Sequence, residues 1–221
     1  MKNIIDLPNA TAERIPMYYR YLKMLEENQV QRIKSQEFSK IVHVPSATIR
    51  RDFSCFGELG RSGYGYDVVF LEKTFAKVLN IERLEKIALI GVGNLGLALI
   101  KNNFRRNPNL QITIAFEVNE TLTDTIVSGV PIYGMDLLKE KIKENEITTA
   151  ISTVPSSDAN QVLQNLAAAG VHAVLNFAPE RLDIPEGMTV RYIDLTSELQ
   201  NLIYLSNRNQ ARIENDMVDQ F

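Results

Sequence analysis

Apolar residues recur at three- and four-residue steps near the start of the chain, which is the spacing of one face of an amphipathic helix. Residues 10–30 read ATAERIPMYYRYLKMLEENQV, and their apolar stripe consists of Ile15, Tyr18, Tyr19, Leu22 and Leu25. Proline lacks the N–H group that a helix interior uses, so Pro16 is expected only in or near the first turn. The pattern predicts a first helix across this stretch.

Two shorter helices are predicted next, and each opens on a serine, a residue that favours the N-terminal end of a helix. The first starts at Ser35, which is expected to be its N-cap. Its apolar side consists of Phe38, Ile41 and Val42. The second opens on Ser46 and ends at Gly57, because glycine tolerates the left-handed conformation of a C-cap.

Glycine and tyrosine alternate after the third helix. Residues 57–71 read GELGRSGYGYDVVFL, in which the glycines alternate with Tyr64 and Tyr66 ahead of a β-branched DVV, and this predicts a small β-hairpin. A further helix over 70–82 closes this part of the chain near residue 80. Helix, helix, turn, helix and hairpin in this order predict a winged helix-turn-helix, whose last helix before the hairpin lies in the major groove of DNA.

The second half alternates strand-like and helix-like runs, which predicts an α/β fold with a Rossmann-like parallel sheet and crossover helices. The expected domains are a winged helix DNA-binding domain over 1–80 and the parallel-sheet domain over 81–195, followed by residues 196–221. In chain order the predicted segments are strand 86–92, helix 94–103, strand 111–117, helix 135–145, strand 148–154, helix 158–170 and strand 172–178.

Length and composition agree with two modest soluble domains. The chain has 221 residues, of which 45% are hydrophobic and 23% charged, and no apolar run approaches the ~20 residues that span a bilayer. The start of the chain has no basic region followed by an apolar one, and Cys55 is the one cysteine, so a cytoplasmic, reducing location is expected. Residues 1–80 hold 12 Lys and Arg against 9 Asp and Glu, whereas residues 81–221 hold 12 against 18. This weak asymmetry has the direction expected of a DNA-reading module at the N-terminus.

The third predicted helix presents arginine on its outward side. On a helical wheel of about 100° per residue, Ile49, Phe53 and Phe56 define the buried side. Arg51 points away from them, and Arg50 lies on the flank. Arginines, hydroxyl groups and a small residue on an outward face can contact guanine edges and phosphates. The predicted DNA-contacting residues are Ser46, Ala47, Thr48, Arg50, Arg51, Arg61 and Tyr66.

The alternative interpretation is that Arg50 and Arg51 are ordinary exposed charges, with Asp52 as their neighbour. The helix alone favours that alternative, whereas the flanking helices and the glycine hairpin favour DNA reading. Cys55 also falls toward the outward side, but the chain has no second cysteine to resolve an oxidised thiol, so Cys55 is interpreted as a small filler.

A glycine motif, GVGNLG, stands between a predicted strand and a predicted helix, where it is typical of a dinucleotide-binding loop. Gly91 permits the tight turn, Gly93 lets a pyrophosphate approach the backbone, and Gly96 lets helix and strand pack closely. Glu117 ends the next strand, placed to accept both ribose hydroxyls and to repel the 2′-phosphate of NADP, so NAD(H) is the expected cofactor. The alternative is a glycine-rich turn that only packs. The predicted cofactor-binding residues are Gly91, Val92, Gly93, Asn94, Leu95, Gly96, Glu117, Thr153, Val154, Pro155 and Asn176.

No catalytic constellation accompanies this loop in the sequence. There is no Ser-Tyr-Lys set, no histidine with an orienting carboxylate and no pair of loop carboxylates. His43 and His172 stand apart from partners at metal-ligand spacing, so neither a metal site nor a catalytic residue is predicted. A nucleotide site without chemistry, joined to a DNA reader, indicates a sensor. The rival hypothesis is an NAD-dependent oxidoreductase with an N-terminal interaction domain.

Taken in order, these motifs closely resemble the redox-sensing transcriptional repressor Rex family over almost the whole chain. The matching stretches are ATAERIPMYYRYL, SATIRRDFSCFGELGRSGYGYDV, IALIGVGNLGLAL, AFEVNE, ISTVPSSDANQV, AGVHAVLNFAPERL and RYIDLTSELQNLIYL. The resemblance implies a homodimer on double-stranded operator DNA. Such a repressor controls genes of anaerobic or fermentative metabolism and leaves its operator when NADH rises relative to NAD+.

The resemblance also implies roles for residues outside these two sites. Arg20 and Asp194 resemble the family's redox-dependent salt bridge between subunits. In the family the C-terminal helix is swapped between subunits, and here residues 196–221 are expected to form that dimerisation helix and a tail, with the helix after Thr196. Its apolar stripe would consist of Leu199, Leu202, Ile203 and Leu205.

Three positions depart from the family's pattern. The acidic ribose ligand is usually aspartate and is Glu117 here, and Ser62, next to Arg61, stands where the wing usually carries arginine. Asn102 stands where the family has a tyrosine near the nicotinamide, the alternative partner of the aspartate of the salt bridge. The last change bears on discrimination between NADH and NAD+. An alternative function is therefore a Rex-like regulator with a weakened or lost redox response.

Overall fold

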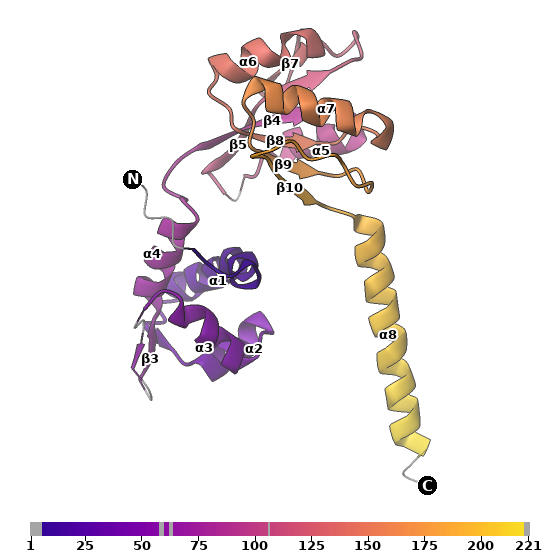
Figure 1. The fold of residues 1–221 in the computed structure, drawn as a ribbon. Coiled ribbons are helices and arrows are strands. Elements are labelled where there is room, and N and C mark those ends of the chain that lie inside the picture. The colour runs from indigo at the N-terminus through magenta and orange to yellow at the C-terminus, as the bar shows by residue number, and fades with distance from the viewer. Residues whose placement is uncertain (1–5, 58–59, 62–63, 106, 219–221) are drawn as a thin grey trace. The chain divides into compact units, whose positions relative to one another are not determined.

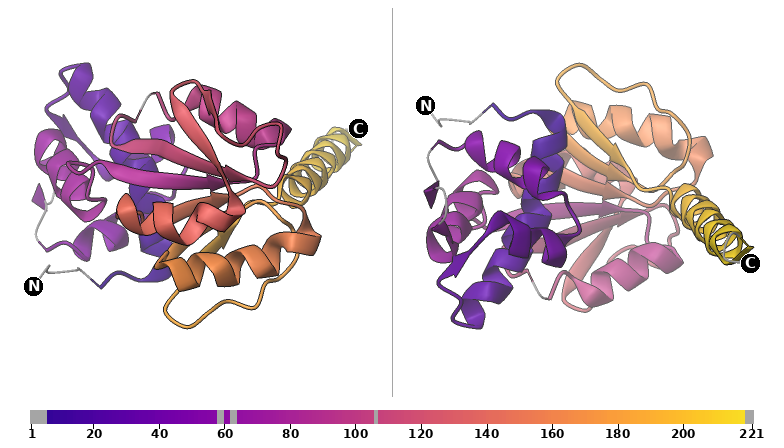
Figure 2. Two further views of the ribbon diagram at one scale, coloured as in Figure 1. Left: turned by 90° about the horizontal axis from the view of Figure 1, so that it is seen from above. Right: turned by 90° about the horizontal axis from the view of Figure 1, so that it is seen from below.

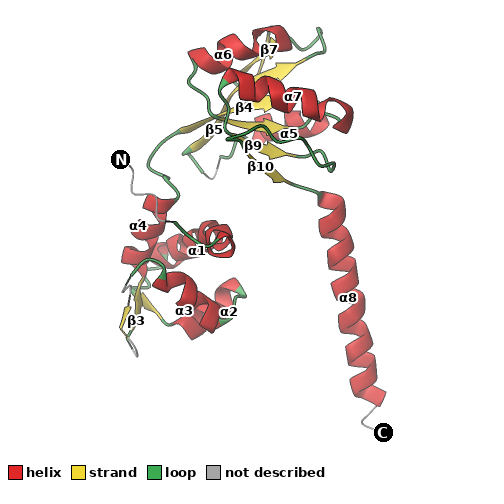
Figure 3. Ribbon diagram, in the orientation of Figure 1, coloured by secondary structure: helices red, strands yellow, loops and turns green. Residues whose placement is uncertain are grey.

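The computed structural model describes residues 6–57, 60–61, 64–105 and 107–218. The chain consists of two compact units, residues 1–83 and 84–221, and each has its own hydrophobic core. Figure 1 labels the helices and strands of both units, and Figure 3 colours them by type.

The first unit consists of four helices and a small antiparallel sheet. Strand β3 lies between β1 and β2, and β2 and β3 form the predicted hairpin. The pattern of the sequence misses β1 because two residues are too few to show a period of two. The elements are α1 (Asn9–Glu27), β1 (Arg32–Ile33), α2 (Ser35–Val42), α3 (Ser46–Ser54), β2 (Gly60–Arg61), β3 (Gly65–Asp67) and α4 (Val68–Val78).

Pro16 lies inside α1 and not in or near its first turn, so that prediction is wrong. The helix begins at Asn9, well before the proline, and runs on to Glu27. Ile15 and Tyr18, on either side of Pro16, are 1% and 0% exposed. Burial of this apolar face stabilises the helix by more than the one missing backbone hydrogen bond costs.

The start of α2 differs by one residue from the predicted serine cap, whereas α3 begins at Ser46 as predicted. Lys34, not Ser35, is the N-cap of α2, and the Glu37 carboxylate accepts the Lys34 N–H at 3.0 Å. Ser46 is the first helical residue of α3, and Pro45 precedes it as the cap. In both helices the serine is therefore inside the first turn.

The observed boundaries of the hairpin segment also differ from the predicted ones. The C-cap of α3 is Cys55, and Gly57 follows two residues later with a φ of +86°, in the left-handed region expected of it. Val68 belongs to α4 and not to the hairpin. Asp67 caps that helix by accepting the Phe70 N–H at 2.9 Å, so the β-branched run continues as helix.

Aromatic side chains form the centre of the first core. Tyr18, Phe38, Phe53 and Phe75, one from each helix, are at most 1% exposed. The centroid of the Tyr18 ring lies 5.6 Å from that of Phe53, edge to face, and 5.7 Å from that of Phe38. The Phe53 and Phe75 centroids are 5.5 Å apart. All four helices thus meet at one aromatic cluster.

A carboxylate is buried in the same core. Asp52 of α3 is 2% exposed and accepts four side-chain hydrogen bonds, all from α1. Arg14 donates two, from Nε to Oδ2 and from Nη2 to Oδ1, both at 2.7 Å. The Tyr18 hydroxyl donates to Oδ2 at 2.7 Å, and the Thr11 hydroxyl to Oδ1 at 2.8 Å. Asp52 is therefore bonded to α1 and not to its neighbours Arg50 and Arg51.

A seven-stranded sheet forms the centre of the second unit, with the order β10-β9-β8-β4-β5-β7-β6. Neighbouring strands are parallel except for β6 and β7. The carboxyl ends of β8, β4 and β5 therefore meet at one edge of the sheet. The strands are β4 (Glu85–Ile90), β5 (Leu110–Glu117), β6 (Thr125–Val127), β7 (Val130–Gly134), β8 (Thr149–Ser152), β9 (Ala173–Asn176) and β10 (Thr189–Tyr192).

Helices cover both faces of this sheet, as the alternating pattern predicts. Helix α5 lies on one face, and α6 and α7 lie on the other (Figure 2). Along β4, Ala88 and Ile90 face the core below α6 and α7, whereas Ile87 and Leu89 face the core below α5. The helices are α5 (Asn94–Asn102), α6 (Leu138–Glu144) after a 3₁₀ turn η1 (Met135–Leu137), and α7 (Ser156–Ala169).

Three strands of this sheet were not predicted. β7 contains Pro131, which argues against a strand in a sequence but is accommodated here beside β6. Ser128 and Gly129 join β6 to β7 with φ values of +49° and +83°, the positive angles of a tight hairpin turn. β10 lies at the edge of the sheet beside β9.

The last helix, α8 (Leu195–Val218), follows β10 and begins at Leu195, slightly before the predicted start. Five of its apolar side chains are 51–67% exposed, so no other described part of this chain buries these five, whereas Leu205 of the predicted stripe is half-buried. The five are Leu195, Leu199, Leu202, Ile203 and Tyr204. No helix among the described residues is long and apolar enough to cross a membrane.

The Asp52 cluster predicts a specific loss of stability at low pH. Burial alone raises the pKa of Asp52, but the hydrogen bonds from Arg14, Tyr18 and Thr11 outweigh it and hold that pKa below its usual value. Its contribution is therefore complete above about pH 4 and is lost as the pH falls through the folded-state pKa. We expect Asp52→Asn to lower the free energy of unfolding by about 2–3 kcal/mol at neutral pH, since Arg14 keeps some contact with water.

Urea unfolding followed by tyrosine fluorescence measures this difference, because five of the eight tyrosines lie in residues 1–83. The gap between the native protein and Asp52→Asn should shrink as the pH is lowered below about 4. A gap that is the same at neutral and at acidic pH would show that the charge of Asp52 does not stabilise the unit.

Candidate nucleotide and nucleic-acid interfaces

The glycine loop of the second unit begins where β4 ends. Gly91 has a φ of +89°, and its N–H donates to the Phe116 carbonyl of β5 at 2.9 Å. A Cβ at this position would lie 3.1 Å from Val154 and 3.2 Å from the Thr153 backbone. Both the backbone angle and the close neighbours therefore require glycine.

The two other glycines of the motif differ in their surroundings. A Cβ on Gly96 would overlap the Gly91 carbonyl oxygen and lie 3.2 Å from the Thr153 hydroxyl, so only glycine lets α5 approach the loop. A Cβ on Gly93 would meet no atom within 4 Å. The side of the loop at Gly93 is open, which is what a ligand against the backbone needs.

The loop after β8 is bonded to the glycine loop. The Thr153 hydroxyl donates to the Gly91 carbonyl at 2.7 Å, and the Thr153 N–H donates to the Ile90 carbonyl at 2.9 Å. In α5 the Leu97 N–H donates to the Gly93 carbonyl at 2.8 Å. The N–H groups of the first turn come before Leu97, so they have no partner within the helix. A helix N-terminus with open N–H groups favours an anion.

Glu117, at the end of β5, closes the loop from the other side. Its Oε2 accepts the Val92 N–H at 2.5 Å, and its Oε1 accepts the N–H groups of Val118 and Asn119 at 2.8 Å and 3.1 Å. A carboxylate has about four acceptor positions, so about one remains, on Oε2. Glu117 can therefore accept two ribose hydroxyls only if it gives up one of these backbone bonds.

The structure brings most of the predicted nucleotide residues together at this edge, with differences in exposure. The Val92 side chain is 1% exposed, so only its backbone faces the loop. Asn94 and Leu95 form the first turn of α5 and are exposed, while Val154 and Pro155 follow Thr153 at the end of β8.

Asn176 is the exception among them, since it is fully buried at the end of β9. Its Nδ2 donates to the Ala178 carbonyl at 2.9 Å, and its Oδ1 has no partner among the described atoms. Ser152 lies beside it in the neighbouring strand, and its hydroxyl is likewise buried without a described partner. This pair lies at the carboxyl ends of β8 and β9, and the binding role predicted for Asn176 stays a prediction.

The outward face of α3 is the candidate nucleic-acid interface of the first unit. Ile49 and Phe53 are buried, whereas Ala47, Arg50 and Arg51 are exposed, as the helical wheel predicts. The other predicted DNA-contacting residues of this helix, Ser46 and Thr48, are half-buried.

The hairpin packs against the same helix. The Tyr66 ring of β3 lies edge to face on Phe53, with centroids 4.9 Å apart. The Arg50 Nη1 donates to the Ser35 hydroxyl at 3.4 Å, a long contact between α3 and the start of α2. The backbone of Arg61 lies in β2, and Ser62 lies outside the described residues.

Cys55 is exposed at the end of α3, on the outward side that the helical wheel predicts. Its Sγ lies 3.6 Å from the Arg51 carbonyl oxygen.

The predicted switch residues lie in different units. Arg20 is exposed on α1, with its guanidinium carbon 5.1 Å from the centroid of the Tyr21 ring. Asp194 caps α8 by accepting the N–H groups of Thr196 and Ser197 at 3.0 Å and 3.2 Å. The Ser197 hydroxyl donates to it at 2.5 Å, and the hydrogen bonds from Ser197 hold the pKa of Asp194 below its usual value.

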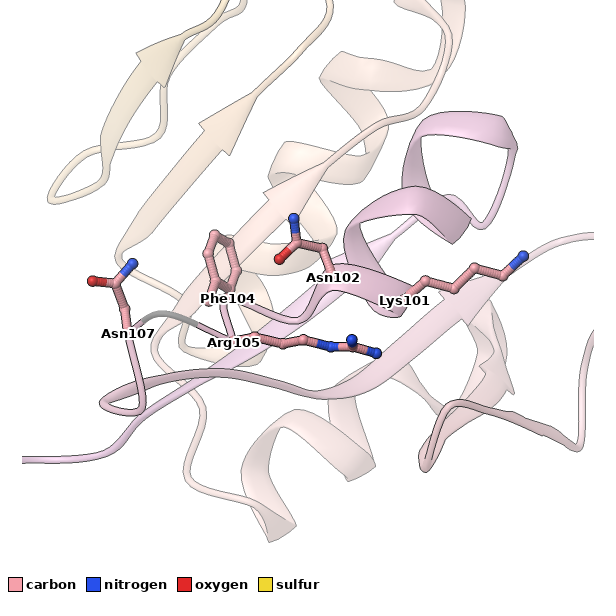
Figure 4. A pocket seen from close by; sticks show the side chains of 5 residues that line it. All are labelled: Lys101, Asn102, Phe104, Arg105 and Asn107. Atoms are coloured by element: carbon pink, nitrogen blue, oxygen red, sulfur yellow. The ribbon is translucent and has the colours of Figure 1, made fainter.

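Asn102, the third switch residue, is exposed at the end of α5 and lines a pocket of about 620 Å³ (Figure 4). The backbone beyond it is held in place, because Asn103, in the left-handed region, bonds both backbone groups of Ile112 through its side chain. The other residues of the pocket are Lys101, Phe104, Arg105 and Asn107.

The partners of Asp52 were not predicted from the sequence. Thr11, Arg14 and Tyr18 follow one another at steps of three and four, so they lie on one face of α1. On the wheel of α3, Asp52 falls on the buried side, next to Phe53. An acid on one buried face and an arginine on another were the available signal, but nothing in the sequence showed that these two faces meet.

Two family models match the chain. A model described as a putative DNA-binding protein N-terminus matches residues 6–54, and a model described as a CoA binding domain matches residues 82–180. They fall on the first unit and on the parallel sheet of the second.

Relatives match almost the whole chain. The redox-sensing transcriptional repressor Rex of Latilactobacillus sakei is 57% identical over 198 residues, which cover 90% of this chain and 95% of that protein. Redox-sensing transcriptional repressor Rex 2 of Enterococcus faecalis is 54% identical over 200 residues, which cover 90% and 93%.

Solved structures agree in fold. The crystal structure of RSP, a Rex-family repressor, matches with a TM-score of 0.85 and 28% identity, covering 96% of this chain and 99% of that one. The structure of RSP with beta-NAD+ and operator DNA matches with the same TM-score and identity. The fold class and the family resemblance expected from the motifs are confirmed: the chain belongs to the redox-sensing transcriptional repressor Rex family.

Proposed function

We propose that this protein is a homodimeric, cytoplasmic repressor that binds operator DNA and NAD(H) and leaves the operator when NADH rises relative to NAD+. The observation that carries the proposal is the presence, in one chain, of an outward arginine face on α3 and an open glycine loop held by β5 and β8. The names of the relatives support a regulator over an oxidoreductase. RSP has been crystallised with beta-NADH and with beta-NAD+ and operator DNA.

In this proposal α3 enters the major groove of the operator. Arg50 and Arg51 contact base edges and phosphates, and Ala47 allows close approach. Tyr66 supports the helix from β3, and Arg61 extends the contact along the wing.

The residues at the sheet edge fit a dinucleotide. The pyrophosphate would lie on the open side of Gly93, against the N–H groups of the first turn of α5. The adenine ribose would reach the remaining acceptor position of Glu117, and the loop over 153–155 would line the other wall. The nicotinamide ring, when bound, supplies the redox signal, and this chain only has to distinguish its two forms.

Helix α8 is proposed to form the dimer. Its apolar face is more than half exposed in the single chain, and a second copy of the chain can bury it. Arg20 of one subunit and Asp194 of the other would then form the switch that the family resemblance implies.

Asn102 favours a second candidate function, a Rex-like regulator with a weakened redox response. Its amide is shorter than a tyrosine phenol and neutral, and it stands exposed at the end of α5. Such a regulator would bind both nucleotides but leave DNA less completely when NADH is bound.

Arg51→Ala should weaken operator binding by about 1–3 kcal/mol, because the exposed guanidinium contacts a base edge. Its effect on folding should be small, since the side chain is outside the core. Fluorescence anisotropy with labelled operator measures this. Lys77→Ala, which removes an exposed charge at the end of α4, is the matched control and should bind as the native protein does. Equal affinity of the folded Arg51→Ala variant and the control would refute the assignment of α3.

Gly93→Ala and Gly96→Ala should separate ligand binding from folding of the loop. An added methyl group at 93 meets no protein atom, so this variant should keep its melting temperature yet bind NADH at least about tenfold more weakly, since the methyl group occupies the place of the pyrophosphate. The Gly96 variant should lose both stability and binding, because its Cβ would overlap the Gly91 carbonyl. Calorimetry and thermal melts measure both. Native NADH affinity in Gly93→Ala would place the pyrophosphate elsewhere.

Glu117 should determine the choice between NADH and NADPH. The native protein should bind NADH more tightly than NADPH. Glu117→Gln should reduce the ratio of these two affinities by about tenfold, because the repulsion of the 2′-phosphate is removed. Glu117→Asp keeps the charge and is the control, which should still prefer NADH. Calorimetric affinities that are equal for NADH and NADPH in the native protein would contradict the placement of the ribose.

A further inference from the structure

A single carboxylate connects α3 to α1. Asp52 accepts four hydrogen bonds between 2.7 Å and 2.8 Å, and all of their donors lie on one face of α1. Asp52 and Tyr18 are 2% and 0% exposed, and Thr11 is 5% exposed. No other described residue of α3 donates or accepts a side-chain hydrogen bond with α1.

This polar contact restrains α3 in a way that its apolar contacts do not. Ile49 and Phe53 also face the core, but apolar contacts tolerate small rotations and shifts of a helix because they have no preferred direction. Hydrogen bonds weaken steeply away from a straight geometry. The two parallel bonds from Arg14 fix the plane of the carboxylate as well as its distance.

The restrained residue lies next to the outward arginines. Asp52 follows Arg50 and Arg51 directly in α3. A rotation of the helix about its axis that moves the carboxylate therefore also displaces both guanidinium groups, which lie at the ends of long side chains far from the axis. A buried ion pair is weak evidence for stability as such, since well-packed apolar residues often do as well. The directed bonds of this ion pair bear instead on the geometry of α3.

We propose that Asp52 is a positioning residue for operator recognition, which holds α3 through Thr11, Arg14 and Tyr18 at the rotation that lets its arginines read base edges. The inference rests on the proposed function of α3. Contacts to phosphates tolerate small rotations, because they depend on charge and distance, whereas base-edge contacts require aligned donors and acceptors. Loss of the cluster therefore reduces the specificity for the operator and leaves non-specific binding to DNA nearly unchanged.

The test compares two DNA duplexes for each variant of the full-length protein. One duplex is selected by the native protein from a random pool, and the other has the same base composition in shuffled order. Anisotropy titrations at fixed salt, at a temperature where all variants are folded by circular dichroism, give the ratio of the two affinities. Asp52→Asn should lower this ratio about tenfold or more, with the affinity for the shuffled duplex within about twofold of native.

Two smaller changes test the individual donors. Tyr18→Phe keeps the ring in the aromatic cluster and removes only the hydroxyl, and Thr11→Val does the same for Thr11. Each should lower the specificity ratio by about threefold to tenfold, in the range of one lost hydrogen bond. Thr11→Ser retains a hydroxyl and should restore most of the ratio.

A structural control separates positioning from general loosening. Leu71→Ala removes buried side-chain volume from α4, in the same core, and removes none of the four hydrogen bonds of Asp52. It should lower the melting temperature and keep the specificity ratio. An equal loss of specificity in Leu71→Ala, or an unchanged ratio in Asp52→Asn, would overturn the inference. If the native protein selects no sequence from the pool, the proposed function of α3 fails first, and the two failures are distinguishable.

Discussion

The carboxylate of Asp52 is the constraint on which the first unit depends. Four helices meet at an aromatic cluster, and such a cluster by itself allows several similar arrangements of its rings. The hydrogen bonds of Asp52 to α1 select one of them, and they do so from the helix that carries Arg50 and Arg51. The outward face of α3 is thereby defined by a polar contact on its inward face.

A comparable constraint acts in the second unit at the glycine loop. Gly96 has no space for a side chain beside the Gly91 carbonyl, and Thr153 donates to the same carbonyl from the neighbouring loop. Glu117 fixes the loop from β5 by accepting the Val92 N–H. The loop is thus shaped by contacts that the protein makes itself, and its open side at Gly93 is available to a ligand. A site formed in advance loses less free energy on ordering when the ligand binds.

Periodicity and motif context were sufficient to predict the fold class of both units, but not β1, β6, β7 and β10. The stripe of Ile15, Tyr18 and Leu22 indicated α1, and the glycine motif between an apolar strand and a helix indicated the nucleotide loop. The exposed position of Arg51 followed from helical geometry alone. These features are local, or they repeat along one element, so a single sequence contains them.

The features that were missed depend on contacts between distant elements. Pro16 was expected near a helix start, because its neighbours in the core of the fold were unknown. The buried role of Asp52 was not predicted, since its partners lie 34–41 residues away in the chain. For both residues the missing information was which faces meet. Glu117 was expected to accept both ribose hydroxyls, but three backbone N–H groups, two of them from the residues that follow it, already donate to it.

In the proposed function, the nucleotide bound at the glycine loop controls the affinity of α3 for DNA. A ligand can lower the affinity of a protein for DNA only as far as it binds the DNA-competent and the incompetent dimer with different affinities. The most direct measurement is a titration of operator DNA with the native protein, by anisotropy, without nucleotide and at saturating NAD+ or NADH. We expect NADH to weaken binding to the operator and NAD+ to leave it unchanged. Operator affinity that is the same in all three titrations, while calorimetry shows that both nucleotides bind, would contradict this expectation.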